Sequence, residues 1–421
     1  MCSSGSEDDE DMEACLLICI GLFYNRNRTA KRKPVILRKR LCLEYQVQLL
    51  LEEGQFERYY RMSSRSFELL LCLIAKDLVV NDKMSFKRTR CVPITPANKL
   101  QMVICWLVGG NYNQVRMAGG CSVPFFYTVV WQVVDAINKV QDLALVFPLS
   151  IEDLNKTAAQ FRVKSSDQFM TNCIGCIDGW LCRIDVPSKN TVADQKSFYS
   201  GHYSAHGVNV QACVDARCCF TAFSCNSPGG MGDALAFENW GLKGILENLV
   251  STHSVFGDNA YVQSMHCMTP FTKPELNADS TGGRSVFNFL LSQLRIRVEM
   301  AFGLLVNKWR LLKKNLRVKI GNIPRLLHCL FRLHNFCIIQ NTEANPEYEA
   351  EKEVEDIISQ TMNSHEEFWY LSTHHEIKND ESNICIGLGH RVRDIMVESI
   401  LRLGLKRSDK NIKRNYARKD L

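Results

Sequence analysis

Residues 285–312, SVFNFLLSQLRIRVEMAFGLLVNKWRLL, decide the fold of this chain. Apolar side chains recur in this stretch at steps of three and four residues, which is the period of an amphipathic helix. The predicted buried stripe consists of Val298, Phe302, Leu305, Trp309 and Leu312. The stretch has one acidic residue, Glu299, which lies about 100° around the helix from Val298. Its carboxylate is therefore expected at the edge of the stripe, half-sheltered but able to face a cleft.

A simpler interpretation of Glu299 is an intrahelical ion pair with Arg295, four residues earlier. Such a pair stabilises a helix by only about 0.2–0.5 kcal/mol. Structural ion pairs also imitate functional sites, because both bring charges together. The helix alone does not decide between a site residue and a structural pair.

The composition is that of a globular chain: 421 residues, 46% hydrophobic and 23% charged, enough for two or three domains. The net charge of +6 is unevenly distributed. Six acids lie in 7–13, and nine acids lie in 343–367 against the single cation Lys352. The rest of the chain is therefore strongly basic, which predicts a polyanionic partner, most often nucleic acid. Excess Lys and Arg can also simply keep a surface soluble.

The cysteine pattern indicates a reducing compartment. The chain has 19 cysteines, an odd number, and no secretory signal precedes them. Cys173 and Cys176 form one C-x-x-C, but no second pair lies at zinc-ribbon spacing, so we predict no structural zinc. The apolar run 15–24 is well short of the roughly 20 residues that span a bilayer, so we expect no membrane association.

The two ends of the chain are predicted to lie outside the main domains. We expect 1–40 to be a poorly ordered arm, acidic first and then basic over 26–40. Such a basic run is typical of nuclear import or phosphate contact, so we expect the nucleus, with cytoplasm, as the location. At the other end, 341–421 is interpreted as an acidic linker followed by a helical and basic tail.

Residues 41–150 have a helical pattern that includes a helix-turn-helix-like region. Thr95 and Ser122 are placed as N-caps of two apolar helices, with a short helix between glycine pairs. A helix that reads base edges normally offers Arg, Asn, Gln or Lys. Residues 123–137 offer only Gln132 among uncharged long polar side chains, so we expect little sequence discrimination from this domain.

Residues 160–340 change to a mixed α/β pattern. Short β-branched, aromatic and cysteine-rich runs alternate with Gly, Pro and Asp, which indicates strands. The predicted strands are 171–186, 206–215, 219–225 and 253–262, with a helix over 237–250. Mixed α/β is therefore the expected class.

Two acids in these strands are candidate site residues. Asp178 interrupts an apolar strand, which is costly unless the carboxylate meets a cation, a donor or water. Asp258 lies where a strand ends, the place at which open α/β sheets expose ligand sites. Either acid alone is more often a turn or capping residue.

Four ordered blocks resemble the DDE endonuclease domain of the PIF/Harbinger transposase family. They are GCIDG (175–179), FYSGHYSAHGVNVQACVD (198–215), FGDNAYV (256–262) with MTPF (268–271), and FNFLLSQLRIRVEMAFGLLVNKWRLL (287–312). The resemblance extends over residues 55–405. It implies an RNase H-like mixed sheet with flanking helices, preceded by the helix-turn-helix-like domain.

The resemblance implies that Asp178, Asp258 and Glu299 hold divalent metal and catalyse the cutting of DNA at transposon ends. Their oxygen ligands suit Mg²⁺ or Mn²⁺, and two such cations about 3.5–4 Å apart can activate the nucleophile and stabilise the leaving oxygen. Asp178 is the expected shared ligand, with Asp258 and Glu299 each completing one side. Gly303, one turn beyond Glu299, would leave space for a substrate backbone or permit close helix packing.

The family also implies DNA as the substrate and a Myb-like accessory protein that supplies end recognition and nuclear import, and an oligomer is compatible with it. The chain departs from the family at 203–205, Tyr-Ser-Ala, where members often have Lys or Arg. Asp233 follows a glycine-rich turn, and we interpret it as a turn residue and not as a fourth ligand. The alternative function is a domesticated DNA- or partner-binding protein whose acids persist without turnover.

Overall fold

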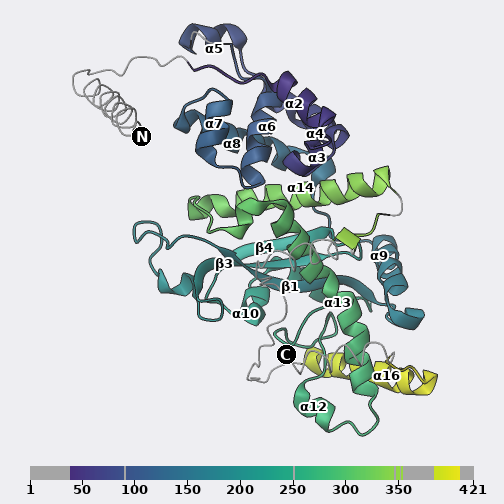
Figure 1. The fold of residues 1–421 in the computed structure, drawn as a ribbon. Coiled ribbons are helices and arrows are strands. Elements are labelled where there is room, and N and C mark those ends of the chain that lie inside the picture. The colour runs from purple at the N-terminus through teal and green to yellow at the C-terminus, as the bar shows by residue number, and fades with distance from the viewer. Residues whose placement is uncertain are drawn as a thin grey trace, which may run out of the picture.

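The computed structural model describes residues 38–89, 92–249, 252–345, 348–350, 352–353 and 384–407. A helical domain lies at one end of the molecule, and a sheet covered by helices follows it (Figure 1). The predicted acidic start and most of the basic arm lie outside the described residues, as do most of the acidic segment and the end of the tail. Arg40, the last cation of the arm, is described, and it donates to the carbonyls of Val92, Pro93 and Gly119.

Seven described helices form the N-terminal domain. They are α2 (Leu43–Glu52), α3 (Phe56–Tyr60), α4 (Ser64–Leu78), α5 (Asp82–Thr89), α6 (Pro96–Leu107), α7 (Tyr112–Ala118) and α8 (Val123–Lys139). Both predicted N-caps are confirmed. The Thr95 side chain accepts from the Asn98 N–H at 3.2 Å, and the Ser122 hydroxyl accepts from the Phe125 N–H at 3.4 Å. Each hydroxyl satisfies a donor that the helix itself leaves unpaired.

Helix α8, which holds the position of a recognition helix, is part of the core. Its apolar side chains pack between α4, α6 and α14 (Ile323–Ala344). Arg325 of α14 pairs with Asp135 and lies over the Trp131 ring, 4.9 Å from its centroid. The Asn138 side chain also donates to the Arg325 carbonyl at 2.9 Å. Because α14 covers it, α8 does not present these faces to a DNA groove.

The sheet is mixed, as predicted. Its strands are β1 (Cys173–Arg183), β2 (Tyr199–Ser200), β3 (Ala205–Val214), β4 (Phe220–Pro228), β5 (Ser254–Phe256) and β6 (Cys267–Met268). The order is β2-β3-β1-β5-β6, with β4 paired to β3. Strand β1 runs antiparallel to β3 and parallel to β5, so it lies inside the sheet with a partner on each side.

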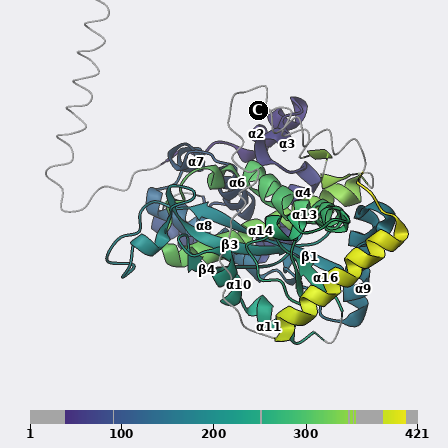
Figure 2. The same ribbon diagram turned by 90° about the horizontal axis from the view of Figure 1, so that it is seen from below.

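Helices cover the sheet, as the two views show (Figures 1 and 2). They are α9 (Ile151–Lys164), α10 (Asp233–Glu238), α13 (Gly283–Lys308) and α14, each of which contacts a strand. Helix α11 (Gly241–Glu247) packs on α10, and α12 (Lys273–Asn277) packs on α13. Helix α13 packs on β1, β3 and β5. The whole predicted stripe from Val298 to Leu312 is buried, which confirms the helix-period interpretation.

Two predicted helix boundaries are wrong. The helix expected over 237–250 is two short helices, because Trp240 adopts an extended backbone and buries its ring beside Phe237. The long helix predicted to reach Leu312 ends at Lys308, where Trp309 leaves helical geometry and the chain continues as a 3₁₀ turn over Arg310–Lys313. In both cases burial of a tryptophan overrides local helical preference.

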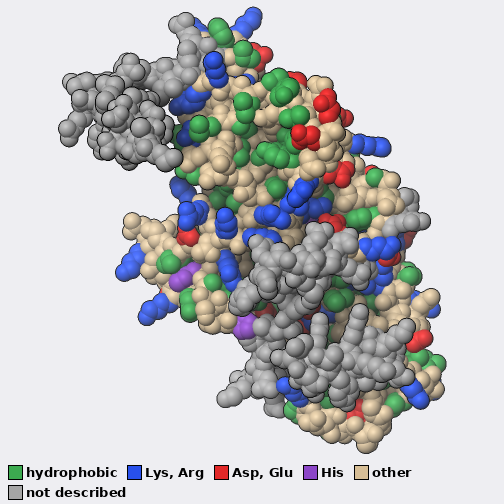
Figure 3. Space-filling view, viewed as in Figure 1, with side chains coloured by type: hydrophobic (Ala, Val, Ile, Leu, Met, Phe, Trp, Pro, Cys, Tyr) green, Lys and Arg blue, Asp and Glu red, His purple; other side chains and the backbone are tan. Residues whose placement is uncertain are grey.

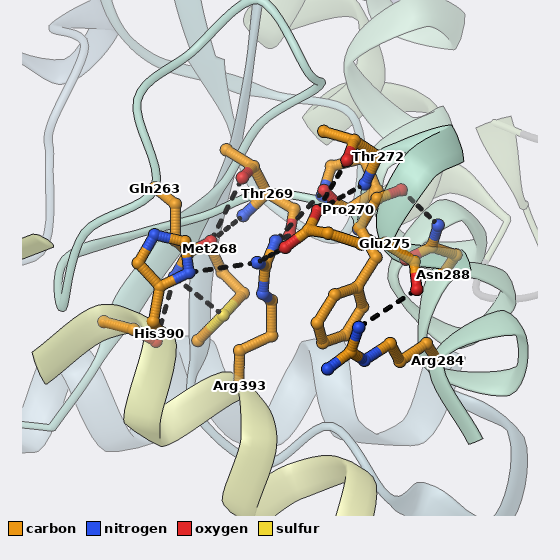
Figure 4. A network of polar contacts seen from close by, with 12 residues as sticks. Gln263, Met268, Thr269, Pro270, Thr272, Glu275, Arg284, Asn288, His390 and Arg393 are labelled. Atoms are coloured by element: carbon orange, nitrogen blue, oxygen red, sulfur yellow. Dashed lines mark hydrogen bonds and ion pairs between the residues drawn. The ribbon is translucent and has the colours of Figure 1, made fainter. Parts of the chain in front are cut away.

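Helix α16 (Ile384–Leu403) packs on α13 and β6, and a network of polar contacts joins it to the segments on either side of β6 and to α12 (Figure 4). The Arg393 guanidinium is buried, lies 3.8 Å from the Phe271 ring centroid, and donates to Glu275 at 2.6 Å and to the Pro270 carbonyl at 3.2 Å. The Gln263 side chain donates to the Gly389 carbonyl at 3.2 Å. A buried arginine needs such partners, because an unpaired charge away from water is costly.

Two sequence expectations concern cysteines and membranes. All 14 cysteines with described surroundings are free thiols. No single helix within the described ranges is long and apolar enough to cross a bilayer. Helices α7 and α8 meet that criterion only as a pair, and the pair is bent by 92°.

Candidate active site

The three predicted site acids lie on the three elements where the sequence placed them. Asp178 is on β1, opposite Ala212 of β3. Asp258 follows β5, the parallel neighbour of β1, after a single residue. Glu299 is on α13, the helix that packs across β1 and β5. These acids, 80 and 41 positions apart in the sequence, are thus carried by adjoining elements.

Arg295 connects two of the three acids. Its Nη1 lies 3.5 Å from Asp178 Oδ2, and its Nη2 lies 2.5 Å from Glu299 Oε1. All three side chains are only 20% exposed. The intrahelical pair that competed with the site interpretation of Glu299 is therefore present, but it does not stand alone. The same guanidinium also binds the strand carboxylate, so the pair is part of the cluster.

The electrostatics of the cluster show mutual repulsion that one arginine offsets. Burial raises the pKa of Asp178 well above its usual value, and Asp258, Glu299 and Asp233 raise it further, while Arg295 acts in the opposite direction. Burial would lower the pKa of Arg295, but Glu299, Asp178 and Asp258 outweigh this and raise it. Cations favour the ionised form of such crowded carboxylates.

Asp258 also organises the turn that follows β5. Its Oδ1 accepts from the Ala260 N–H at 2.9 Å, and its carbonyl accepts from the Tyr261 N–H at 3.3 Å. This is the turn role expected of an isolated aspartate. The turn fixes Asp258 beside β1, close enough for its charge to raise the pKa of Asp178.

Asp233 is more than the turn residue that the sequence suggested. A Cβ atom at Gly179 would lie 2.1 Å from Asp233 Oδ1, so this carboxylate packs directly against the backbone next to Asp178. Asn209 and Gln211 donate to the same oxygen at 2.9 and 2.8 Å. These bonds fix a fourth carboxylate at the edge of the cluster.

A further hydrogen bond orients the Gln211 amide that contacts Asp233. The Tyr261 hydroxyl donates to Gln211 Oε1 at 2.6 Å, which leaves the Gln211 amide N–H to face Asp233. The sequence carried a signal for this arrangement. Asn209 and Gln211 alternate on an otherwise apolar strand, and residues two apart on a strand share one face. Two amides on one buried face require polar partners.

Gly303 leaves space instead of permitting close packing. A Cβ atom built there would have no heavy atom within 4 Å, apart from the backbone of its own helix turn and its chain neighbours. Close helix packing would place a neighbour within that distance. The structure thus shows unfilled space one turn beyond Glu299 and no close helix contact, although Gly303 itself is buried.

The donor set fits divalent metal in its chemistry. Asp178, Asp258 and Glu299 offer carboxylate oxygens, which Mg²⁺ and Mn²⁺ prefer. Their present positions do not form a ligand cage: within the described residues, no three His, Cys, Asp or Glu side chains are arranged to hold a metal ion. The Arg295 guanidinium lies between two of the carboxylates, so a cation that binds both must displace it.

Comparison with known proteins gives a match to one family model. Residues 177–335 match the family model described as DDE superfamily endonuclease. The matched range begins one residue before Asp178 and includes Asp258 and Glu299. It supports a transposase-like nuclease of the DDE superfamily, and the mixed α/β fold is consistent with that class. No curated protein and no solved structure matches the chain significantly.

Proposed function

We propose that this DDE-type domain makes the chain a Harbinger-type transposase nuclease, which cuts DNA at transposon ends with Mg²⁺ or Mn²⁺. The observation that carries the proposal is the meeting of Asp178 and Glu299, from β1 and α13, on one guanidinium. Asp258 lies at the end of the neighbouring strand. Carboxylates from separate elements that are brought together and raise one another's pKa are typical of a functional site.

In this function the chain positions three carboxylates. Asp178, Asp258 and Glu299 would hold the cations, which supply an activated water and relief of charge on the leaving oxygen. Strand β1 holds Asp178 rigidly, because it is hydrogen-bonded to strands on both sides. Gly303, one turn beyond Glu299 on the same helix, has unfilled space beside it but is itself buried, so a substrate backbone would reach that space only after a neighbouring segment moves.

We also propose that sequence recognition comes from a Myb-like accessory protein and that the protein acts in the nucleus, with a cytoplasmic fraction. Supporting this, α8 is covered by α14 and offers no array of base-reading side chains.

Plasmid nicking in Mg²⁺ or Mn²⁺ tests the proposal, with Asp258→Asn and Glu299→Gln as variants. We expect both variants to lose nicking while keeping the fold, because each loses one ligand oxygen. In metal-free buffer, each should melt at the same temperature as wild type or higher, since a repelling charge is gone. Added Mn²⁺ should raise the melting temperature of wild type more than that of either variant.

Glu398→Gln, an exposed acid on α16, is the matched control and should nick like wild type. Full cleavage by either site variant would refute the assigned acids. If Glu299→Gln loses a little stability but nicks like wild type, Glu299 serves only as the partner of Arg295 in a structural ion pair.

A second function, a catalytically silent DNA- or partner-binding protein, is favoured by one observation. Arg295 occupies the position between Asp178 and Glu299 that a shared cation would need. This function predicts metal-independent DNA binding, no strand breakage in either metal and no shift in melting temperature with Mn²⁺.

A further inference from the structure

A strongly basic loop follows the active-site helix directly. Residues 310–319, RLLKKNLRVK, contain five cations and no acid. Two contacts fix the backbone of the loop. The side chains of Leu312 and Leu316 are buried, and the Leu316 N–H donates to the carbonyl of Arg183, at the end of β1, at 2.9 Å. Its charged side chains are consequently presented from a fixed backbone, and Arg310, Lys313 and Lys314 are all exposed.

The helical domain adds two arginines to this loop. A Cβ atom at Gly109, between α6 and α7, would lie 3.1 Å from the Arg310 Cβ, so the loop packs against that turn. Burial lowers the pKa of Arg61 at the end of α3, and the nearby charges of Arg310 and Arg58 lower it further. Glu353, which pairs with Lys308 at 3.9 Å, acts in the opposite direction.

These three arginines lack acidic partners. Among the described residues, no carboxylate forms an ion pair with Arg58, Arg61 or Arg310, and Arg61 Nε is buried without a hydrogen bond. Arg61 also has a φ of 59°, a left-handed conformation that favours glycine at a helix end. Three like charges held together, with no acid in an ion pair with them and only Glu353 nearby in opposition, are unfavourable in isolation and suit an anionic ligand.

The space-filling view agrees with this grouping. Figure 3 shows Lys and Arg side chains gathered across the middle of the molecule, between the helical domain and the sheet. Helix α13 continues nine residues beyond Glu299 to Lys308, roughly 14 Å along its axis, and the loop begins two residues later. Duplex DNA advances about 3.4 Å per base pair. The loop therefore lies within a few base pairs of the acids, as a continuous duplex would require.

We propose that Arg58, Arg61, Arg310, Lys313 and Lys314 form a basic surface that binds the phosphate backbone of duplex DNA beside the active site. The proposal rests on the function proposed above and assigns residues that the catalytic acids do not include. Arginine forks match phosphate oxygens, and contacts of this kind give affinity and register without sequence readout.

The test measures binding of full-length protein to a labelled duplex of arbitrary sequence in EDTA, where no cutting occurs, over a series of KCl concentrations. The variant is Arg58→Gln/Arg61→Gly/Arg310→Gln. Log affinity falls with log salt, and each lost phosphate contact makes this fall shallower by about 0.9 in slope. Three lost contacts therefore reduce the steepness by up to about 2.7. At 0.1 M salt we expect affinity to fall by about one to two orders of magnitude.

Glycine at position 61 suits the left-handed backbone, so weaker binding would not reflect a damaged fold. The control is Lys273→Gln/Arg391→Gln/Arg402→Gln, which removes the same charge from exposed positions on α12 and α16, at the opposite end of the molecule (Figure 1). We expect its slope to equal that of wild type, and both variants to melt within a few degrees of it.

The outcomes separate this proposal from the nuclease function. An unchanged slope in the first variant, or equal losses in both variants, would overturn the basic surface and leave the nuclease proposal standing. Wild-type protein that binds no duplex would overturn both. A shallower salt dependence in the first variant, together with no nicking by wild type in metal, would refute the nuclease and leave the basic surface standing, because binding is measured without metal.

Discussion

At the residue scale, Arg295 determines how the acid cluster behaves without metal. One guanidinium neutralises part of a site in which Asp178, Asp258, Asp233 and Glu299 all contribute negative charge. A cation that enters between Asp178 and Glu299 must compete with it. Arg295 thus supports the metal-free fold and would compete with any cation that bound both carboxylates.

Replacing Arg295 by methionine, which keeps an apolar stem of similar length, should separate these effects. We expect metal-free protein to lose on the order of 1–3 kcal/mol of unfolding free energy, because two half-buried carboxylates lose a partner. The stabilisation by Mn²⁺ should increase relative to wild type. Urea unfolding with and without Mn²⁺ measures both changes, with Ile296→Met, an exposed position on α13, as control. A Mn²⁺ effect equal to that of wild type would contradict the competition.

The sequence predicted which acids lie on which elements, because an acid in an apolar strand and an acid at a strand end are local signals. It did not predict Asp233 as a neighbour of Asp178, since their contact depends on the missing side chain of Gly179 and on the fold of β3 and α10. It also did not predict that Arg295 reaches Asp178, because the distance between a helix and a strand is set by packing.

At the element scale, periodicity predicted long elements well and boundaries poorly. The burial of the stripe from Val298 to Leu312 and the caps of α6 and α8 are as expected, although the last two stripe residues lie beyond the end of α13. Strand β5 spans only Ser254–Phe256, and the helix over 237–250 is broken at Trp240. Both differences come from tertiary contacts, which a local pattern does not contain.

Helix α14 contains a titratable group that should give the fold a measurable pH dependence. His334 is buried and its Nε2 lies 2.9 Å from the Cys218 carbonyl oxygen. Burial lowers the pKa of His334 to about 3, despite the opposing bond to Cys218. The unfolded histidine titrates near about 6.5. Between these values the unfolded chain binds one more proton here, so stability falls as pH decreases, by up to about 1.4 kcal/mol per pH unit.

Urea unfolding of wild type and His334→Gln at pH 7, 6 and 5 measures this contribution. Glutamine keeps an N–H donor for the Cys218 carbonyl but does not titrate. We expect the wild type to lose stability relative to the variant at each step toward pH 5. Parallel profiles for the two proteins would show that His334 is not held neutral.

At the scale of the whole molecule, the helical domain contacts the α/β domain through the packing of α8 on α14. The sequence predicted a helical domain before an α/β domain, and it predicted that residues 123–137 would be poor at reading bases. It gave no indication of what those apolar residues contact. The structure shows that α14, about 190 residues later, covers them and that Arg325 and Asp135 join the two domains. Contacts over such separations leave no local pattern.

The contacts of α16 determine whether the chain that connects it to the body must remain uncut. This helix is attached to the body by Arg393, Gln263 and the close approach of Gly389 to Ser264, and none of these contacts involves residues 354–383. The peptide bond between body and helix should therefore be dispensable once folding is complete. After cleavage at a protease site engineered within 354–383, we expect the two fragments to co-elute on size exclusion, and Arg393→Met to release the smaller one. Separation of the wild-type fragments would show that α16 depends on its tether, whereas co-elution would show that its side-chain contacts alone keep it bound to the body.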